Sequence, residues 1–293
     1  YGKCGGVRIM HPVELKVSLF LQNALAGSTT ISEEVADKVA SDVKSAMFKQ
    51  FSGGPRDIFR LRMSNIGKPK CQLWFQKNDP DAKAPYPPSF LINMITGDII
   101  EAVFKGLLRS ADVEFNDNDN VELDLGDLGI IKGEYDMILN GSVDDVKSAS
   151  DVSYNGRFES FDKLEKSDDF GYIPQLVGYA IAAGKDVGGF WVVNKKDGAF
   201  KYVSVSSANK EVILQDIKEK VAYINNDEPF ERCFTSVPEY YRKKASGNLK
   251  LGKSCGWCNF KTKCWPQLKR IPSRVSQAKD KPLVDYILIN DGK

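Results

Sequence analysis

Apolar residues recur every three or four positions along two stretches of the first fifty residues, which is the spacing of one face of an α-helix. Residues 12–25 form the first stretch, which stops at Gly27. The second begins near Thr30–Ser32, where Thr30 and Glu33 fit a capping box, and ends before the breaker at residues 52–55. We therefore expect residues 1–54 to form an N-terminal helical segment packed on the main body of the protein.

The middle of the chain alternates helical and strand patterns. Helical periodicity covers residues 89–108, the residues after Pro174, and 209–226. Strand patterns cover residues 120–125, 133–139 and 142–147, with a turn at Asn140-Gly141 between the last two. Two further strands, 189–194 and 200–205, flank a hairpin turn. This order predicts an α/β (α+β) fold with a mixed central sheet flanked by helices, rather than a repeat protein or a coiled coil.

Composition excludes several classes of function. The chain has one histidine, His11, so no site can use two histidines, and a Ser-His-Asp triad is disfavoured. No apolar run approaches the length that spans a membrane, so we expect no membrane association and a cytoplasmic location. Catalysis, if present, must come from carboxylates, lysines, tyrosines and cysteines.

The net charge of +2 conceals an uneven distribution of charge. Residues 242–274 contain ten basic side chains and no acid, whereas residues 112–145 contain eleven acids and one base, Lys132. A basic stretch of this size indicates a polyanionic partner, and clustered acids indicate a cation site. On charge alone, solvated surfaces that cancel one another are an equally good interpretation.

Three of the six cysteines lie close together in the basic stretch: Cys255, Cys258 and Cys264. Two thiolates in C-x2-C spacing bind one soft metal site, and the third can supply a further ligand. Cys71 is our first choice for the fourth ligand, with Cys233 or Cys4 as alternatives. Spacing does not separate zinc from a [4Fe–4S] cluster, since thiolates suit both.

Asp145 and Lys147 lie two residues apart on a predicted strand and therefore point to one face. Asp136 ends the preceding strand and can reach the same face, and Glu101 on the preceding helix can supply a third carboxylate. Converging carboxylates make a hard oxygen site for Mg²⁺ or Mn²⁺, and a lysine beside them can orient a water. The alternative is an acidic, solvated hairpin in which Lys147 only pairs with Asp145.

Gln175 and Tyr179 lie one turn apart on the helix that follows, so they share a face and can both reach a substrate at this site. As a pair without this context they would be ordinary helix surface.

In this order, these motifs resemble the RecB-like branch of the PD-(D/E)xK nucleases, in particular its iron–sulfur members. The matching elements are Glu101, Asp136, Asp145-Val146-Lys147, Gln175-x3-Tyr179 and one early cysteine followed by three in C-x2-C-x5-C spacing. The segment from Arg60 through Ser64 to Cys71 also resembles phage-type members. The resemblance covers roughly residues 60–270. Relatives often carry histidine in place of Glu101, an aromatic residue in place of Val146, and threonine in place of Ser148.

The resemblance implies a PD-(D/E)xK restriction-endonuclease-like core in residues 55–270, stapled by the cluster, with residues 271–293 as a C-terminal tail. It implies a DNA exonuclease for single strands or ends, acting in recombination, repair or replication and encoded by a cell or a phage. Glu101, Asp136, Asp145 and the Val146 carbonyl would hold Mg²⁺ or Mn²⁺, and Lys147 would position the attacking water. Gln175, Tyr179, Arg62 and Ser64 would contact DNA, and Cys71, Cys255, Cys258 and Cys264 would hold a [4Fe–4S] cluster.

Two other classes remain open at this point. A non-catalytic nucleic-acid-binding protein with a Cys4 zinc or iron–sulfur module accounts for the cysteines and the basic stretch, but leaves the carboxylates and Lys147 unexplained. An electron-transfer protein with one cluster explains neither the pair Asp145 and Lys147 nor the basic stretch. The sequence leaves the polarity of digestion, the oligomeric state and the protein partners open.

Overall fold

The computed structural model describes residues 10–52 and 59–290, so Cys4 and most of the predicted break at residues 52–55 lie outside the described residues. The described chain divides into two compact units. The first unit comprises residues 10–52, 61–67 and 87–219, and the second comprises residues 59–60, 68–86 and 220–290. The sequence prediction placed residues 55–270 in one domain, whereas the cysteine-bearing part belongs to a unit with a hydrophobic cluster of its own, around Leu251 and Trp265.

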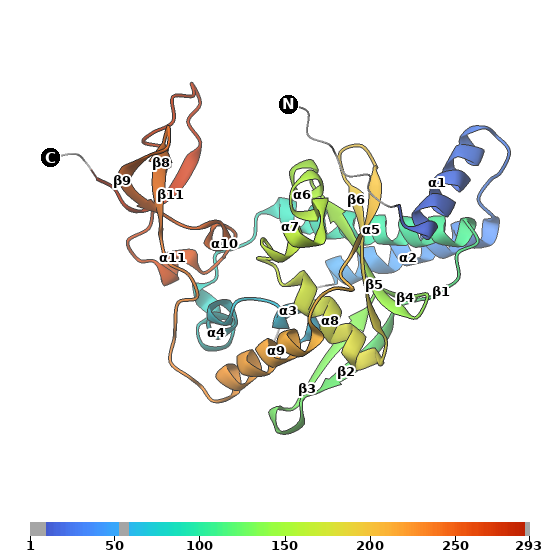
Figure 1. Ribbon diagram of the computed structural model, residues 1–293, viewed down its shortest axis with the longest axis horizontal. Helices are drawn as coiled ribbons and strands as arrows, with labels where there is room; N and C mark the ends of the chain where they lie inside the picture. Colours follow the sequence, from blue (N-terminus) through green and yellow to red (C-terminus); the bar gives the residue numbers. More distant parts are fainter. Residues whose placement is uncertain (1–9, 53–58, 291–293) are drawn as a thin grey trace. The chain divides into compact units, whose positions relative to one another are not determined.

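The first unit is built around a mixed sheet (Figure 1). Its helices are α1 (Pro12–Leu25), α2 (Glu33–Phe51), α3 (Met63–Ile66), α5 (Pro88–Ser110), α6 (Asp151–Asn155), α7 (Phe161–Glu165), α8 (Tyr172–Ala183) and the first part of α9 (Lys210–Asn225). Its strands are β1 (Phe115–Asn116), β2 (Asp119–Asp124), β3 (Ile130–Tyr135), β4 (Met137–Leu139), β5 (Ser142–Ala149), β6 (Asp186–Asn194) and β7 (Phe200–Ser204). Short 3-10 turns occupy Gly126–Leu128 and Arg157–Glu159.

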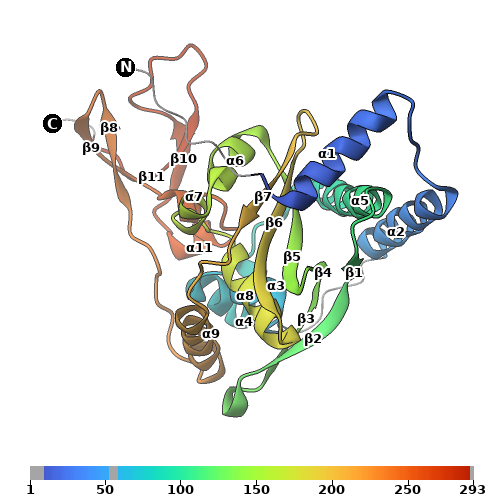
Figure 2. The ribbon, with the colours of Figure 1, turned by 45° about the vertical axis from the view of Figure 1, so that its right-hand side comes forward.

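The five-stranded sheet has the order β1-β4-β5-β6-β7, and β2 and β3 form a separate two-stranded ribbon. Strands β5 and β6 are parallel, and the other neighbours in this sheet are antiparallel. The predicted mixed α/β fold, with a mixed sheet flanked by helices, is therefore confirmed. Figure 2 shows α1 and α5 on one side of β5 to β7 and α8 on the other.

The N-terminal helices begin where local capping allows. His11 Nδ1 accepts a hydrogen bond from the Val13 backbone N–H, and Pro12 opens α1, where a missing N–H costs nothing. The second helix is capped by Ser32, whose hydroxyl accepts from the Val35 N–H, so the predicted cap at Thr30 was wrong by two residues. Both helices contact α5, as expected for a segment packed on the main body.

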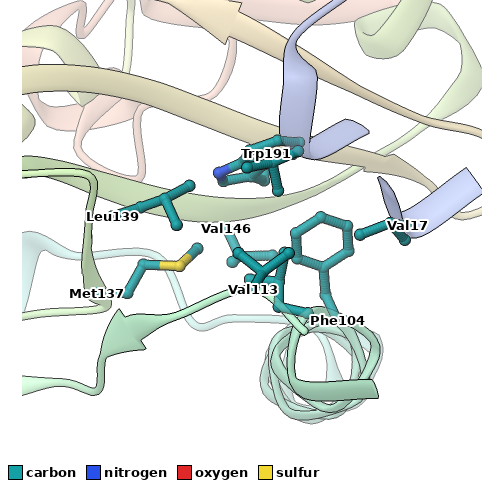
Figure 3. Packing of buried hydrophobic residues seen from close by; sticks show 9 residues of the cluster. Val17, Phe104, Val113, Met137, Leu139, Val146 and Trp191 are labelled. Atoms are coloured by element: carbon teal, nitrogen blue, oxygen red, sulfur yellow. The ribbon is translucent and has the colours of Figure 1, made fainter. Parts of the chain in front are cut away.

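The core of the first unit forms where α1 and α5 cover the sheet (Figure 3). Val17 from α1 and Phe104 from α5 meet Trp191 from β6 and Val146 from β5. The Phe104 ring lies 5.4 Å from that of Trp191, centroid to centroid, and both side chains are buried. Val146 faces this core, so its neighbours Asp145 and Lys147 project from the opposite face of β5.

The strand predicted over residues 133–139 is divided in two. Strand β3 ends at Tyr135 and pairs with β2, whereas β4 begins at Met137 and pairs with β5. Asp136 lies at the break between them. The predicted turn at Asn140-Gly141 is present, with φ of 50° and 82°, which is the geometry that Asn-Gly favours in a two-residue hairpin.

The second unit has a sheet of its own that the sequence analysis missed. It contains α4 (Lys70–Asn78), a 3-10 turn (Pro80–Ala82), the last part of α9, α10 (Lys253–Gly256) and α11 (Lys261–Cys264), with strands β8 (Val237–Tyr241), β9 (Lys244–Lys250), β10 (Lys269–Pro272) and β11 (Leu283–Leu288). The strand order is β10-β11-β9-β8. Strand β11 lies inside this sheet, between β10 and β9, so residues 271–290 are not the separate C-terminal tail that the resemblance implied.

No helix in the described part of the chain is both long enough and apolar enough to cross a lipid bilayer.

Replacing Phe104 with alanine should lower the free energy of unfolding by about 3–5 kcal/mol, because it removes a buried ring that the surrounding core cannot replace. Urea denaturation followed by tryptophan fluorescence measures this loss. Val103→Ala, at the adjacent and 44% exposed position of the same helix, is the matched control and should cost much less. Equal losses in the two variants would contradict the packing described here.

Candidate functional site

Asp136 and Asp145 come together because Asp136 occupies the break between β3 and β4, beside β5. The Asp136 Oδ2 accepts a hydrogen bond of 2.9 Å from the Val146 backbone N–H. This bond fixes the Asp136 carboxylate beside β5, one residue from Asp145. The predicted convergence of these two carboxylates is therefore present in the structure.

Lys147 lies on the same face of β5 as Asp145 and pairs with it. Its Nζ donates a hydrogen bond of 2.7 Å to Asp145 Oδ1. Asp145 Oδ2 lies 2.5 Å from the same Nζ, but it is buried and makes no hydrogen bond of acceptable geometry to the described residues. Both oxygens of the Asp145 carboxylate therefore lie against the Lys147 ammonium, and a cation bound at this site would share them with it.

Glu101 reaches the site from α5 and has a partner that the sequence analysis missed. Lys105, one turn later on the same helix, is 4% exposed, and its Nζ lies 2.8 Å from Glu101 Oε1. The same ammonium lies 3.8 Å from Asp117 Oδ1. The spacing of Glu101 and Lys105, four residues apart on a predicted helix, is the sequence signal that could have identified this pair.

The site is strongly electrostatic because its charges are close together and poorly hydrated. Burial, and then the negative charge of Asp145, raise the pKa of Asp136 to about 7. Burial also raises the pKa of Asp145, although Lys147 opposes the change. Burial, and then Asp136, raise the pKa of Glu101. Three acids that resist ionisation next to one another are an arrangement that a divalent cation stabilises.

Lys147 remains charged in this environment. Burial acts to lower its pKa, but the charges of Asp145 and Asp136 outweigh that effect, and the net result is a pKa above the ordinary value for lysine. The ammonium is therefore a fixed positive charge at the site, not a proton acceptor at neutral pH.

Gln175 and Tyr179 face one another on α8, since Gln175 Nε2 lies 3.3 Å from the Tyr179 hydroxyl in hydrogen-bond geometry. Burial, the largest effect, raises the pKa of Tyr179, and the charges of Asp145 and Asp136 act in the same direction, which places this hydroxyl within electrostatic range of the carboxylates. A Cβ at Gly133 would lie 2.7 Å from Tyr179 Cε1, so only glycine allows β3 to approach Tyr179 this closely.

Tyr172 is a further residue of this site that the sequence analysis did not identify. Lys147 Nζ lies 5.1 Å from the centroid of the Tyr172 ring and 5.9 Å from that of Phe190. Tyr172 precedes Gln175 by three residues and Tyr179 by seven, which is one face of a helix, and this spacing was the available signal. The two rings hold the ammonium by cation–π contact.

Arg62 and Ser64 are exposed at the start of α3. Between them, Met63 is buried, and a Cβ at Gly133 would lie 2.4 Å from Met63 Cβ, so α3 packs beside the strand that supports Tyr179. The described contacts include none between Arg62 or Ser64 and the carboxylates, Gln175 or Tyr179. The predicted contact of Arg62 and Ser64 with DNA stays a prediction.

The cysteines gather in the second unit. One small cavity is lined by all four predicted ligands, Cys71, Cys255, Cys258 and Cys264, together with aromatic side chains that include Trp265. Burial, and then the neighbouring thiols Cys258 and Cys264, raise the pKa of Cys255 to about 11. Thiolates placed this close repel one another unless a metal shares their charge.

Cys233 is a fifth cysteine in this region, and its Sγ accepts a hydrogen bond of 3.1 Å from the Cys71 backbone N–H. The first-choice fourth ligand, Cys71, lines the cavity with the other three. Cys233 is not part of that lining, but its thiol also hydrogen-bonds to the Cys71 side chain and lies within electrostatic range of the other cysteines. The alternative Cys4 lies outside the described residues.

Across residues 10–52 and 59–290, no group of three or more histidine, cysteine, aspartate or glutamate side chains is arranged to hold a metal ion. Both proposed ligand sets would therefore need side-chain adjustment to close on a metal.

Comparison with known proteins identifies no family for this chain. No protein-family model matches the sequence, and no curated protein matches it. A solved structure described as the crystal structure of SSO0001 aligns with 69% of this chain and 91% of its own at 12% sequence identity, with a TM-score of 0.38. A TM-score this low carries no argument about function.

Asp136→Asn should stabilise the protein at pH 8 by on the order of 1–2 kcal/mol. A carboxyl group with a folded pKa of about 7 binds more protons in the folded than in the unfolded chain between pH 4 and pH 7, so its contribution to stability falls as the pH rises through that window. The asparagine variant lacks this loss. Urea denaturation at pH 5 and at pH 8 measures it.

The exposed Asp127→Asn is the matched control and should show the wild-type pH dependence. If Asp136→Asn also keeps the wild-type pH dependence, the Asp136 carboxyl does not carry the raised pKa.

Proposed function

We propose that this protein is a metal-dependent nuclease of the RecB-like PD-(D/E)xK type, which hydrolyses phosphodiester bonds of single-stranded DNA or of DNA ends as an exonuclease. The observation that carries the proposal is the convergence of three carboxylates and one lysine from separate elements. Glu101 comes from α5, Asp136 from the break after β3, and Asp145 and Lys147 from β5. A solvated hairpin would not bury these charges together.

The donor set fits a hard divalent cation. Glu101, Asp136 and Asp145 offer carboxylate oxygens, which Mg²⁺ and Mn²⁺ prefer. The Val146 carbonyl remains a proposed fourth ligand. When bound, the metal would supply Lewis-acid activation of water and neutralise charge on the scissile phosphate.

The remaining side chains act on water and substrate. Lys147, held by Asp145 and by the Tyr172 and Phe190 rings, presents a fixed ammonium that orients the attacking water and stabilises negative charge that develops on the phosphate. The hydroxyl of Tyr179 and the amide of Gln175 are neutral hydrogen-bonding groups, which suits contact with a DNA strand beside the acids.

A second metal group, a [4Fe–4S] cluster, is proposed for the cavity lined by Cys71, Cys255, Cys258 and Cys264, with Zn²⁺ as the alternative. Because Cys71 precedes the carboxylate motifs and the other three follow them, such a group would join two distant parts of the chain that meet in the second unit. Its role would be structural.

Asp145→Asn should abolish cleavage, with a loss of at least about a thousandfold, because it removes a ligand and the partner of Lys147. The assay is digestion of linear and circular single-stranded DNA with Mg²⁺ or Mn²⁺, with Lys147→Ala in parallel. Cleavage of the linear form only, lost in both variants, is the result expected for an exonuclease. Cleavage of circles would indicate an endonuclease.

Asp144→Asn is the matched control for Asp145→Asn. Its carboxylate lies on the opposite face of β5, where it accepts hydrogen bonds from the Gly189 N–H and from Trp191 Nε1. An asparagine at position 144 keeps one acceptor oxygen for these donors and so keeps the register of β5, and this variant should lose stability yet still cut DNA. If the wild type binds DNA but cuts neither substrate, the non-catalytic binding protein becomes the better proposal.

Cys258→Ser should remove the visible absorbance and the bound iron of protein purified without oxygen, and it should lower the thermal midpoint. Iron, sulfide and zinc analysis of the same preparation decides between a cluster and Zn²⁺. The control is Cys233→Ser, which should retain the metal, since Cys233 is not among the residues that line the cavity. Loss of metal from Cys233→Ser but not from Cys71→Ser would exchange their roles.

A further inference from the structure

The β8–β9 hairpin reverses direction through Arg242 and Lys243, and both residues have positive φ, 47° and 67°. The β4–β5 hairpin uses the same two-residue reversal, but fills it with Asn140 and Gly141 at φ 50° and 82°. Asn-Gly is the preferred pair for this turn, because the left-handed backbone conformation destabilises residues with long side chains by roughly 1 kcal/mol or more. The β8–β9 turn is therefore less stable than an Asn-Gly turn would be, and it carries two basic side chains at its tip.

The charge at this tip is not neutralised. Arg242, Lys243 and the adjacent Lys244 are all exposed, and the described residues provide no ion pair to any of the three. Other lysines of the second unit do have acidic partners: Lys261 Nζ lies 2.6 Å from Asp285 Oδ2, for example. Three consecutive free cations attract a partner with closely spaced negative charges.

Aromatic rings accompany the cations. Tyr240 is 59% exposed, and the guanidinium carbon of Arg242 lies 5.3 Å from the centroid of the Tyr241 ring. Proteins that bind single-stranded nucleic acid combine basic side chains for the phosphates with exposed rings on which bases stack. The exposed Tyr240 ring beside unpaired cations favours nucleic acid as the polyanionic partner.

Buried hydrogen bonds hold the base of the hairpin in place, so the tip projects from an ordered pair of strands. Glu239 is buried on β8 and accepts hydrogen bonds from Asn248 Nδ2, at 2.7 Å, and from the Tyr286 hydroxyl, at 2.8 Å. These bonds connect β8, β9 and β11, so the strain at Arg242 and Lys243 is held by a satisfied buried network.

We propose that the β8–β9 tip, formed by Tyr240, Arg242, Lys243 and Lys244, is a binding element for the backbone of single-stranded nucleic acid. The assignment of that nucleic acid as DNA rests on the proposed function. The element lies in the second unit and contributes affinity, whereas the carboxylates and Lys147 belong to the first unit.

The test is a double variant, Arg242→Asn with Lys243→Gly, which installs the pair found at residues 140–141. The thermal midpoint should rise because the turn is relieved of strain. Binding of fluorescein-labelled oligothymidine, measured by anisotropy without divalent cations, should weaken roughly five- to tenfold at low salt. The dependence of log affinity on log salt should become shallower by roughly 1.4, or 0.7 for each lost phosphate contact.

A matched control removes the same kind of charge elsewhere. Lys163 and Lys196 are exposed and Lys210 is half-buried; all three lie in the first unit, each within 4 Å of an acid. Their triple serine variant should bind oligothymidine like the wild type. The triple serine variant of Arg242, Lys243 and Lys244 should weaken binding further than the double variant.

A stabilised double variant with unchanged affinity would overturn the proposal, and so would an equal loss in the control. Competition by poly-L-glutamate at equal charge would also overturn it, in favour of an acidic protein partner. Because binding is measured without divalent cations, the result does not depend on whether the protein cuts DNA. A protein that binds through the tip but never cleaves would overturn the proposed function alone.

Discussion

The mutual approach of Asp136, Asp145 and Lys147 is the constraint on which the first unit depends, because bringing these charges out of water costs free energy that the rest of the fold must offset. The core of α1, α5 and the sheet provides that stability on the other face of β5. Glu101 and Lys105 add a second ion pair from α5. Free energy invested in holding like charges together is typical of a binding or catalytic site and has no use in a purely structural hairpin.

The second unit also brings together ionisable groups that repel one another when charged, but these groups are thiols. Residues 87–219 of the first unit separate Cys71 from the three later cysteines in sequence, yet all four cysteines line one cavity. The thiol of Cys255 resists ionisation because of burial and of its neighbours Cys258 and Cys264. Such a cavity gains stability when a cation shares the charge of its thiolates, so metal binding and folding of this unit would be coupled.

Local patterns predicted the elements of the first unit well, since periodicity and turn residues report on single elements. The helix at Pro12–Leu25 and the Asn140-Gly141 turn are examples. Contacts between elements that are distant in the sequence were harder to predict from local patterns. Lys105 and Tyr172 became recognisable as site residues only when α5 and α8 were placed against β5. The second sheet was missed because β9 and β10 are mostly polar, and because β11 pairs with β9 across the intervening residues 251–282.

The register of β5 decides which of two adjacent acids serves the site, because a shift of one residue would exchange Asp144 and Asp145. Asp144 prevents that shift. Its carboxylate accepts from the Gly189 N–H, from Trp191 Nε1 and from the Tyr202 hydroxyl, which are all on β6 and β7. A Cβ at Gly188 would lie 1.8 Å from Asp144 Oδ1, so this glycine makes room for the buried acid. One aspartate thus fixes the strand so that its neighbour and Lys147 face the site.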